Sequence, residues 1–196
     1  MNGARTATRR LLDALGGKPI VLVGMMGAGK TSVGRRLANH LGREFLDSDH
    51  EIETAAGMSI EDYFAAHGEE EFRIGETKVI GRLLGEKNIV LATGGGAFAN
   101  ENTRKIIRDR AVSVWIDAEF ELLFSRVSRK SNRPLLKTAD PRGTLKKLME
   151  QRYPLYRLAD VRVTSREVSH DTVANEIIGA LNLHFNQKSQ NPHERQ

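Results

Sequence analysis

The chain has 196 residues, which is enough for one domain with a substantial core and too few for two ordinary domains. It contains no cysteine, which excludes disulfides, thiolate metal sites and a cysteine nucleophile, and it has no apolar run approaching about 18 residues, so we expect no membrane partner. The net charge of +5 does not require a nucleic-acid partner. Most cations alternate with acidic residues, and a substrate with phosphates and a carboxylate accounts for the excess as well.

Three regions are expected along the chain. Residues 1–17 form an arginine-rich N-terminal extension, which we expect to be partly helical through Leu11 and Leu15. A mitochondrial transit peptide is one interpretation, but we favour an untargeted bacterial-type extension on a cytoplasmic monomer. Residues 18–185 form a single domain, and residues 186–196 form a polar tail that we expect to be frayed.

An apolar run at residues 19–23 is typical of a short buried parallel strand, and it leads directly into a glycine-rich turn. Gly24, Gly29, Lys30 and Thr31 match G-x-x-x-x-G-K-[ST], the pattern of a phosphate-binding loop. Glycines let the loop wrap around a polyphosphate, and the next helix turns its N-terminus toward the same anion. A solvated surface turn is the alternative. We predict an ATP site at Gly27, Ala28, Gly29, Lys30, Thr31 and Ser32.

A second short strand is expected at residues 44–46, and it ends in Asp47, Ser48 and Asp49. Because α/β folds place their chemistry at the carboxyl ends of strands, both aspartates are expected to face the phosphate loop. One carboxylate would serve Mg²⁺ through water, and the other would accept a hydrogen bond from a substrate hydroxyl. The alternative is that the triplet only caps a helix starting near His50.

A helical stretch begins at Ser59 and continues to about Leu84. It places Arg73 and Glu76 three residues apart on one face, so the acid can hold the guanidinium in a fixed orientation. An oriented arginine is a good bidentate clamp for a carboxylate. A solvated surface ion pair is the alternative for this spacing.

A third apolar strand at residues 88–92 ends in Gly94, Gly95 and Gly96. Three glycines at the end of a strand indicate that something approaches the backbone closely. We interpret the segment as a turn that faces the substrate, with a flexible loop as the alternative.

The rest of the chain continues the alternation of helices and strands. Residues 126–143 differ, since they are basic, rich in turns and weakly periodic, and we interpret them as a mobile lid over phosphates. A solvated basic loop and an RNA-contacting patch are the alternatives. The other expected elements are helices at 99–108, 119–128, 144–156 and 170–184 and strands at 111–116 and 161–163. The pattern predicts a three-layer α/β fold with a mainly parallel sheet.

Taken together, these segments resemble one family over residues 19–163. The matching motifs include the phosphate loop, Asp47-Ser48-Asp49, Phe72-Arg73 with Glu76, and Gly94-Gly95-Gly96. Arg133-Pro134-Leu135-Leu136 and Arg152-Tyr153-Pro154-Leu155-Tyr156 follow in the same order and spacing. In these motifs the chain is similar to shikimate kinases.

The resemblance implies a nucleoside-monophosphate-kinase-like α/β/α P-loop fold, with five parallel strands in the order 2-3-1-4-5. It implies transfer of the γ-phosphoryl group of ATP to the 3-hydroxyl of shikimate, with Mg²⁺, on the way to chorismate and the aromatic amino acids. The implied catalytic residues are Lys30, Asp49 and Arg133, with Asp49 acting either as a base or by orienting the hydroxyl.

The resemblance also assigns binding roles to single residues. Arg133 would reach ATP from the lid, and Arg126 would lie toward the adenine. Thr31 would ligate Mg²⁺ directly, and Asp47 would assist through water. The implied shikimate site consists of Asp49, Arg73, Gly95 and Arg152, together with Gly94, Gly96 and Glu76.

Two other functions remain open at this point. A kinase for another small polyol acid, such as gluconate, would keep the phosphate loop without needing Asp49, Arg73, Gly95 and Arg152 in one place. A nucleotide-dependent module that binds nucleic acid would instead show salt-sensitive binding and no turnover with shikimate.

Overall fold

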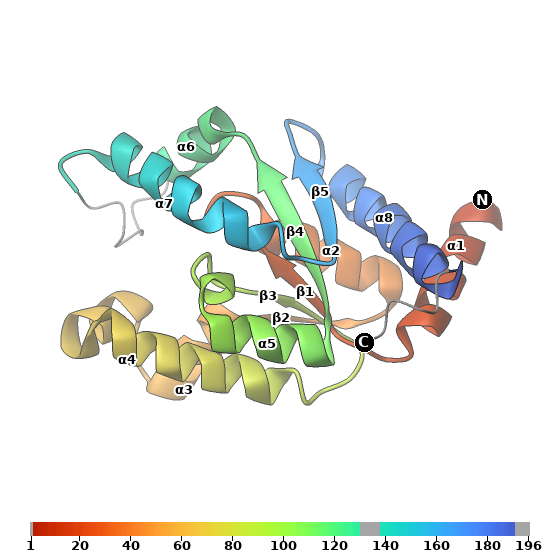
Figure 1. Ribbon diagram of the computed structural model, residues 1–196, viewed down its shortest axis with the longest axis horizontal. Helices are drawn as coiled ribbons and strands as arrows, with labels where there is room; N and C mark the ends of the chain where they lie inside the picture. The colour runs from red at the N-terminus through yellow and green to blue at the C-terminus, as the bar shows by residue number, and fades with distance from the viewer. Residues whose placement is uncertain (1, 130–137, 191–196) are drawn as a thin grey trace.

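The computed structural model describes residues 2–129 and 138–190 (Figure 1). Its centre is a five-stranded sheet in the order β2-β3-β1-β4-β5, and every neighbouring pair is parallel. This confirms the predicted fold class and strand order. The strands are β1 (Ile20–Val23), β2 (Glu44–Asp47), β3 (Ile89–Ala92), β4 (Val112–Ala118) and β5 (Val161–Ser165).

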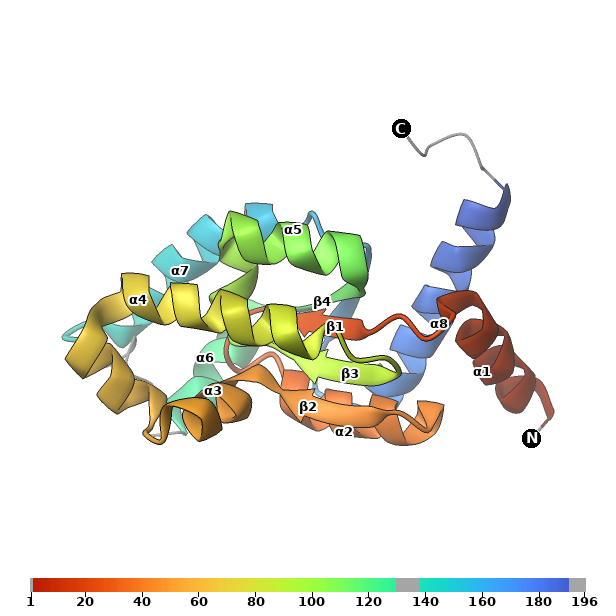
Figure 2. The ribbon, with the colours of Figure 1, turned by 90° about the horizontal axis from the view of Figure 1, so that it is seen from below.

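Helices cover both faces of the sheet (Figure 2). For this reason β1, β3 and β4 are buried along their whole length, as short apolar runs in a parallel sheet require. One face carries α2 (Lys30–Leu41) and α8 (His170–Gln190). The other carries α4 (Ile60–Leu83), α5 (Glu101–Arg110) and α7 (Pro141–Tyr156). The remaining elements are α1 (Asn2–Leu15), α3 (Ser48–Ala56), the 3₁₀ turn η1 (Ala97–Ala99) and α6 (Phe120–Ser128).

The strand register brings three loops to one edge of the sheet. Ala92 at the end of β3 is paired with Leu22 of β1 on one side and with Asp47 of β2 on the other. The carboxyl ends of these three strands therefore lie level. The phosphate loop, the acidic triplet and the glycine segment all start from this edge.

Several element boundaries differ from the sequence prediction. The helix after β2 begins at Ser48 rather than near His50, because Asp47 is its N-cap. α7 begins at Pro141, since proline suits the first turn of a helix. α8 continues to Gln190, so part of the tail predicted to be frayed is helical. Within α4 the chain kinks at Gly68, where φ is 80°.

The N-terminal extension is more ordered than the sequence suggested. α1 lies beside α8, as both views show (Figures 1 and 2). The side chains of Leu11 and Leu15 are 0% and 1% exposed and belong to the same hydrophobic core as the sheet. The two leucines stand one turn apart on one face of α1, which explains why this face docks. Leu11 and Leu15 therefore attach α1 to the core.

The helices were also compared with the length and hydropathy that a membrane span needs. Within residues 2–129 and 138–190, none combines sufficient length with a sufficiently apolar sequence to cross a bilayer.

We predict that Leu15→Ala lowers the free energy of unfolding by about 2–5 kcal/mol, because it opens a cavity in the core. Leu183→Ala on α8 is the matched control: Leu183 is 64% exposed, and its loss should cost less than about 0.5 kcal/mol. Urea unfolding followed by circular dichroism measures both. Equal midpoints for Leu15→Ala and the unmodified protein would show that α1 does not dock.

Candidate active site

The β1–α2 loop has the backbone geometry that its glycine pattern predicts. Gly24 has a φ of 140°, and a Cβ there would lie only 2.5 Å from the carbonyl oxygen of Ile116. Gly29 has a φ of 98° and precedes α2, whose first turn begins at Lys30. The free N–H groups of this turn therefore face the loop, as an anion site requires.

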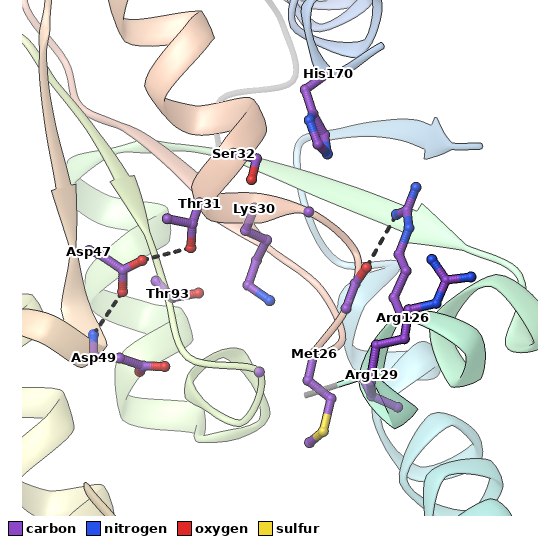
Figure 3. Close-up of a pocket in the computed structure, with 14 residues that line it drawn as sticks. Met26, Lys30, Thr31, Ser32, Asp47, Asp49, Thr93, Arg126, Arg129 and His170 are labelled. Atoms are coloured by element: carbon purple, nitrogen blue, oxygen red, sulfur yellow. Dashed lines mark hydrogen bonds between the residues drawn. The ribbon is translucent and has the colours of Figure 1, made fainter. Parts of the chain in front are cut away.

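A cavity of about 480 Å³ opens over this loop (Figure 3). Asp47 and Asp49 line one end of the cavity, and Arg126 and His170 line the other, with Lys30 between them. The predicted ATP residues that line it are Gly27, Gly29, Lys30, Thr31 and Ser32. Ala28 does not line the cavity: it is fully buried, and its N–H donates to the Met25 carbonyl at 3.2 Å.

Lys30 is held by the loop itself. Its Nζ donates to the carbonyl oxygens of Gly24 at 2.8 Å and Met25 at 2.9 Å, and the residue is 9% exposed. The ammonium therefore lines the cavity from a fixed position beside the loop.

Asp47 connects two elements. One carboxylate oxygen accepts a hydrogen bond from Thr31 Oγ1 at 2.7 Å, and the other accepts from the Asp49 N–H at 3.1 Å (Figure 3). The capping and functional interpretations of the triplet are therefore compatible. Hydroxyl and carboxylate oxygens are the ligands that Mg²⁺ prefers, so this pair fits the predicted metal. Within the described ranges, this site included, no group of three or more histidine or acidic side chains could hold a metal by itself.

The three glycines after β3 lie against predicted site residues. A Cβ at Gly94 would lie 2.6 Å from a carboxylate oxygen of Asp49 and 2.9 Å from Oε1 of Glu76. A Cβ at Gly96 would overlap the guanidinium of Arg73. The glycine triplet indicated that something approaches the backbone closely. In the free protein, the groups that do so are the charged side chains of Asp49, Glu76 and Arg73.

Arg73 and Glu76 form a buried ion pair rather than a solvated one. Their closest nitrogen and oxygen are 2.7 Å apart, and their side chains are 16% and 1% exposed. Arg73 also donates to Glu69 at 3.0 Å and lies over the ring of Phe72. Burial raises the pKa of the Glu76 carboxyl, and Arg73 opposes that shift. Burial lowers the pKa of Arg73, but the two carboxylates outweigh it, so the net direction is upward.

Arg152 reaches the same glycine segment from α7. It is 6% exposed, and a Cβ at Gly95 would lie 3.6 Å from its Nη1. This Nη1 and the Oε1 of Glu76 are both buried and have no hydrogen-bond partner within the part of the chain that the structure describes. Buried polar atoms are normally paired, so the two atoms mark a place that a polar ligand would complete.

A model of the shikimate kinase family matches residues 26–182. The chain belongs to the shikimate kinase family. A relative named shikimate kinase from Rhodopseudomonas palustris is 54% identical over 171 residues, which are 87% of this chain and 84% of the relative.

Solved structures agree with this assignment. Shikimate kinase from Acinetobacter baumannii, in complex with shikimate, is 43% identical, with a TM-score of 0.82 over 87% of this chain and 94% of its own. The enzyme from Aquifex aeolicus is 36% identical, with a TM-score of 0.74 over 86% and 98% of the two chains.

Within this family member, Arg126 joins two segments at the far end of the cavity. Its guanidinium donates to the carbonyl of Gly27 at 3.2 Å and to the hydroxyl of Ser165 at 3.0 Å. His170, at the start of α8, faces Arg126 across this end (Figure 3). Burial and the charges of Arg36 and Arg126 lower the pKa of His170. No local pattern indicated His170, because only the packing of α8 brings it to the loop.

The predicted lid is described only at its ends. Arg133 and residues 130–137 lie outside the described residues, so the position of Arg133 remains a prediction. The first part of the lid lies at the end of α6, and Arg129 there lines the cavity. The last part begins α7, where Arg142 is paired with Glu121.

We predict that Arg73→Ala lowers the free energy of unfolding by about 3–5 kcal/mol, because it leaves the buried Glu76 carboxylate without its main partner. The loss should be larger at pH 8 than at pH 5. The pKa of Glu76 lies above its unfolded value and rises further in the variant, so protonation at lower pH favours the folded state.

Thermal unfolding at both pH values tests this prediction, with Arg73→Ala/Glu76→Gln expected to recover most of the loss. Arg82→Ala is the control on the same helix, since the Arg82–Glu51 pair is exposed and should contribute less than about 1 kcal/mol. A loss that did not depend on pH would contradict the assignment of a stranded buried carboxylate.

Proposed function

We propose that this protein transfers the γ-phosphoryl group of ATP to the 3-hydroxyl of shikimate, giving shikimate 3-phosphate and ADP for chorismate and aromatic amino-acid synthesis. The observation that carries the proposal is a juxtaposition at the glycine segment. Asp49, Arg73 and Arg152 come from three helices and all approach these glycines, next to the phosphate loop. The relatives' names and the shikimate complex from A. baumannii support the choice of substrate.

The charges around the glycine segment suit a small hydroxylated ring acid. Shikimate carries one carboxylate, which Arg73 and Arg152 can neutralise with planar, multi-donor groups. Asp49 can accept a hydrogen bond from the reacting hydroxyl. The missing Cβ atoms of Gly94 and Gly96 let Asp49 and Arg73 approach the segment closely. Glu76 keeps Arg73 in a fixed orientation through their 2.7 Å contact.

The other end of the cavity suits the polyphosphate. The loop N–H groups and Lys30 would bind the β- and γ-phosphates, and in doing so Lys30 would exchange its two loop carbonyls for phosphate oxygens. Arg126 would lie toward the adenine, and Arg133 would approach the transferred group from the lid. During transfer the hydroxyl oxygen forms a bond to the γ-phosphorus, the bond to the bridging oxygen breaks, and ADP leaves. Asp49 orients the hydroxyl and can take its proton.

We include Mg²⁺ in the proposal because the Thr31–Asp47 oxygen pair fits it. Thr31 would ligate the ion directly and Asp47 would act through water. When bound, Mg²⁺ supplies positive charge next to the β- and γ-phosphates of ATP.

The proposal also includes a monomeric, cytoplasmic enzyme without a nucleic-acid partner. Gel filtration of the purified protein tests the monomeric state.

The decisive experiment is a coupled assay of ADP release with shikimate, gluconate and nucleoside monophosphates in parallel. We expect turnover that depends on shikimate and Mg²⁺ and is negligible with the other acceptors. Turnover with gluconate alone would favour the polyol-acid alternative. Salt-sensitive binding of DNA or RNA without turnover would favour the nucleic-acid module.

The two arginine types should affect different kinetic constants. We predict that Arg133→Ala lowers kcat about 10³-fold, because it removes a cation from the charge developing on the transferred group. Arg73→Lys should instead raise the KM for shikimate about tenfold, since lysine keeps the charge near Glu76 but lacks the bidentate fork. Arg108→Ala, at an exposed side chain on α5, is the control. Equal changes of kcat and KM in both site variants would contradict the division of roles.

A further inference from the structure

The backbone of the glycine segment is held at two points by buried hydroxyl groups. The N–H of Gly94 donates to Ser48 Oγ at 3.1 Å, and the Tyr156 hydroxyl donates to the carbonyl oxygen of Gly95. Ser48 is 0% exposed and Tyr156 is 1% exposed. Neither residue is among those that line the cavity over the phosphate loop.

These two hydrogen bonds determine how the segment is oriented. In a planar trans peptide the carbonyl and the following N–H point in opposite directions. The bond from Tyr156 to the Gly95 carbonyl therefore turns the N–H of Gly96 away from the Tyr156 hydroxyl. Glycine backbones have the widest conformational freedom, so a triplet without such restraints would populate many orientations.

Each hydroxyl belongs to the same turn of helix as a predicted substrate residue. Ser48 lies directly before Asp49 at the start of α3. Tyr156 lies four residues after Arg152 on α7, so the two side chains share one face of that helix. Each hydrogen bond therefore connects the glycine segment to a helical turn that contains a predicted substrate residue, Asp49 or Arg152.

The Tyr156 hydroxyl is a permanent donor. Burial raises the pKa of Tyr156 to about 12, and the charge of Arg152 opposes that shift. The phenol therefore keeps its proton over the pH range in which the enzyme would work. The ring is packed against Trp115 and Phe98, which restricts the position of the hydroxyl oxygen.

We propose that Ser48 and Tyr156 are positioning residues for the acceptor substrate: they hold the glycine segment in register with Asp49, Arg73 and Arg152. This inference rests on the proposed function, because the segment forms the predicted shikimate pocket. It extends the set of functional residues beyond those that could touch shikimate. It also gives a role to Ser48, between Asp47 and Asp49, and to Tyr156, one helical turn after Arg152.

The test compares variants that each lose one hydroxyl group and thereby release different backbone groups. Tyr156→Phe and Ser48→Ala remove the two bonds to the glycine segment. Tyr153→Phe is the matched control, since its hydroxyl comes from the same helix and donates to another carbonyl, that of Ala118, at 2.5 Å. Steady-state kinetics with shikimate and ATP, and hydrogen–deuterium exchange of residues 93–97 in the free protein, are measured for each.

We expect Tyr156→Phe and Ser48→Ala to raise the KM for shikimate about three- to tenfold, the effect of one hydrogen bond, with the KM for ATP unchanged. Exchange of residues 93–97 should become faster in both variants. Tyr153→Phe should alter neither quantity, even if it lowers the melting temperature. A shikimate KM that stays at the unmodified value in Tyr156→Phe and Ser48→Ala would overturn the inference.

The exchange measurement separates this inference from the proposed function. If the unmodified protein does not phosphorylate shikimate, the proposed function fails. Unchanged exchange in Tyr156→Phe and Ser48→Ala would overturn the positioning role whatever the substrate is. Faster exchange confined to these two variants, together with the selective rise in KM, would support it.

Discussion

The level ends of three parallel strands are the constraint on which the site depends. Ala92 pairs with both Leu22 and Asp47, so β1, β2 and β3 finish at one edge. The loops that leave this edge carry the phosphate-loop motif, two carboxylates and the glycine segment. A shift of one residue in the register of β2 against β3 would send Asp47 to the opposite face of the sheet and separate it from Thr31.

Two charged side chains of the site are buried, and burial of a charge lowers the stability of the fold. Glu76 and Arg152 are almost fully buried, and each has a polar atom without a partner in the described part of the chain. Such groups destabilise a fold unless they are paired. Both of these residues lie against the glycine segment, and an anionic, hydroxylated ligand there could offset the cost by supplying the missing partners.

Local patterns can support more than one role at the same residue. Asp47 is both the N-cap of α3 and the partner of Thr31, because its two carboxylate oxygens point to different groups. The spacing of Arg73 and Glu76 is equally compatible with a solvated pair and a buried one. Arg73 lies over the neighbouring Phe72 of α4 and against the glycine segment, which follows β3. The second of these contacts depends on the tertiary structure.

The phosphate loop and the alternation of strands and helices follow from the amino-acid sequence, because they depend on short-range spacing and on periodicity. The strand order and the residues expected around the glycine segment came instead from the family resemblance. The fold was needed to show that Leu11 and Leu15 dock α1 onto the domain, that His170 lines the cavity and that Tyr156 contacts the glycine segment. Those contacts join segments far apart in the chain, and their geometry comes from how helices pack on the sheet rather than from any local pattern.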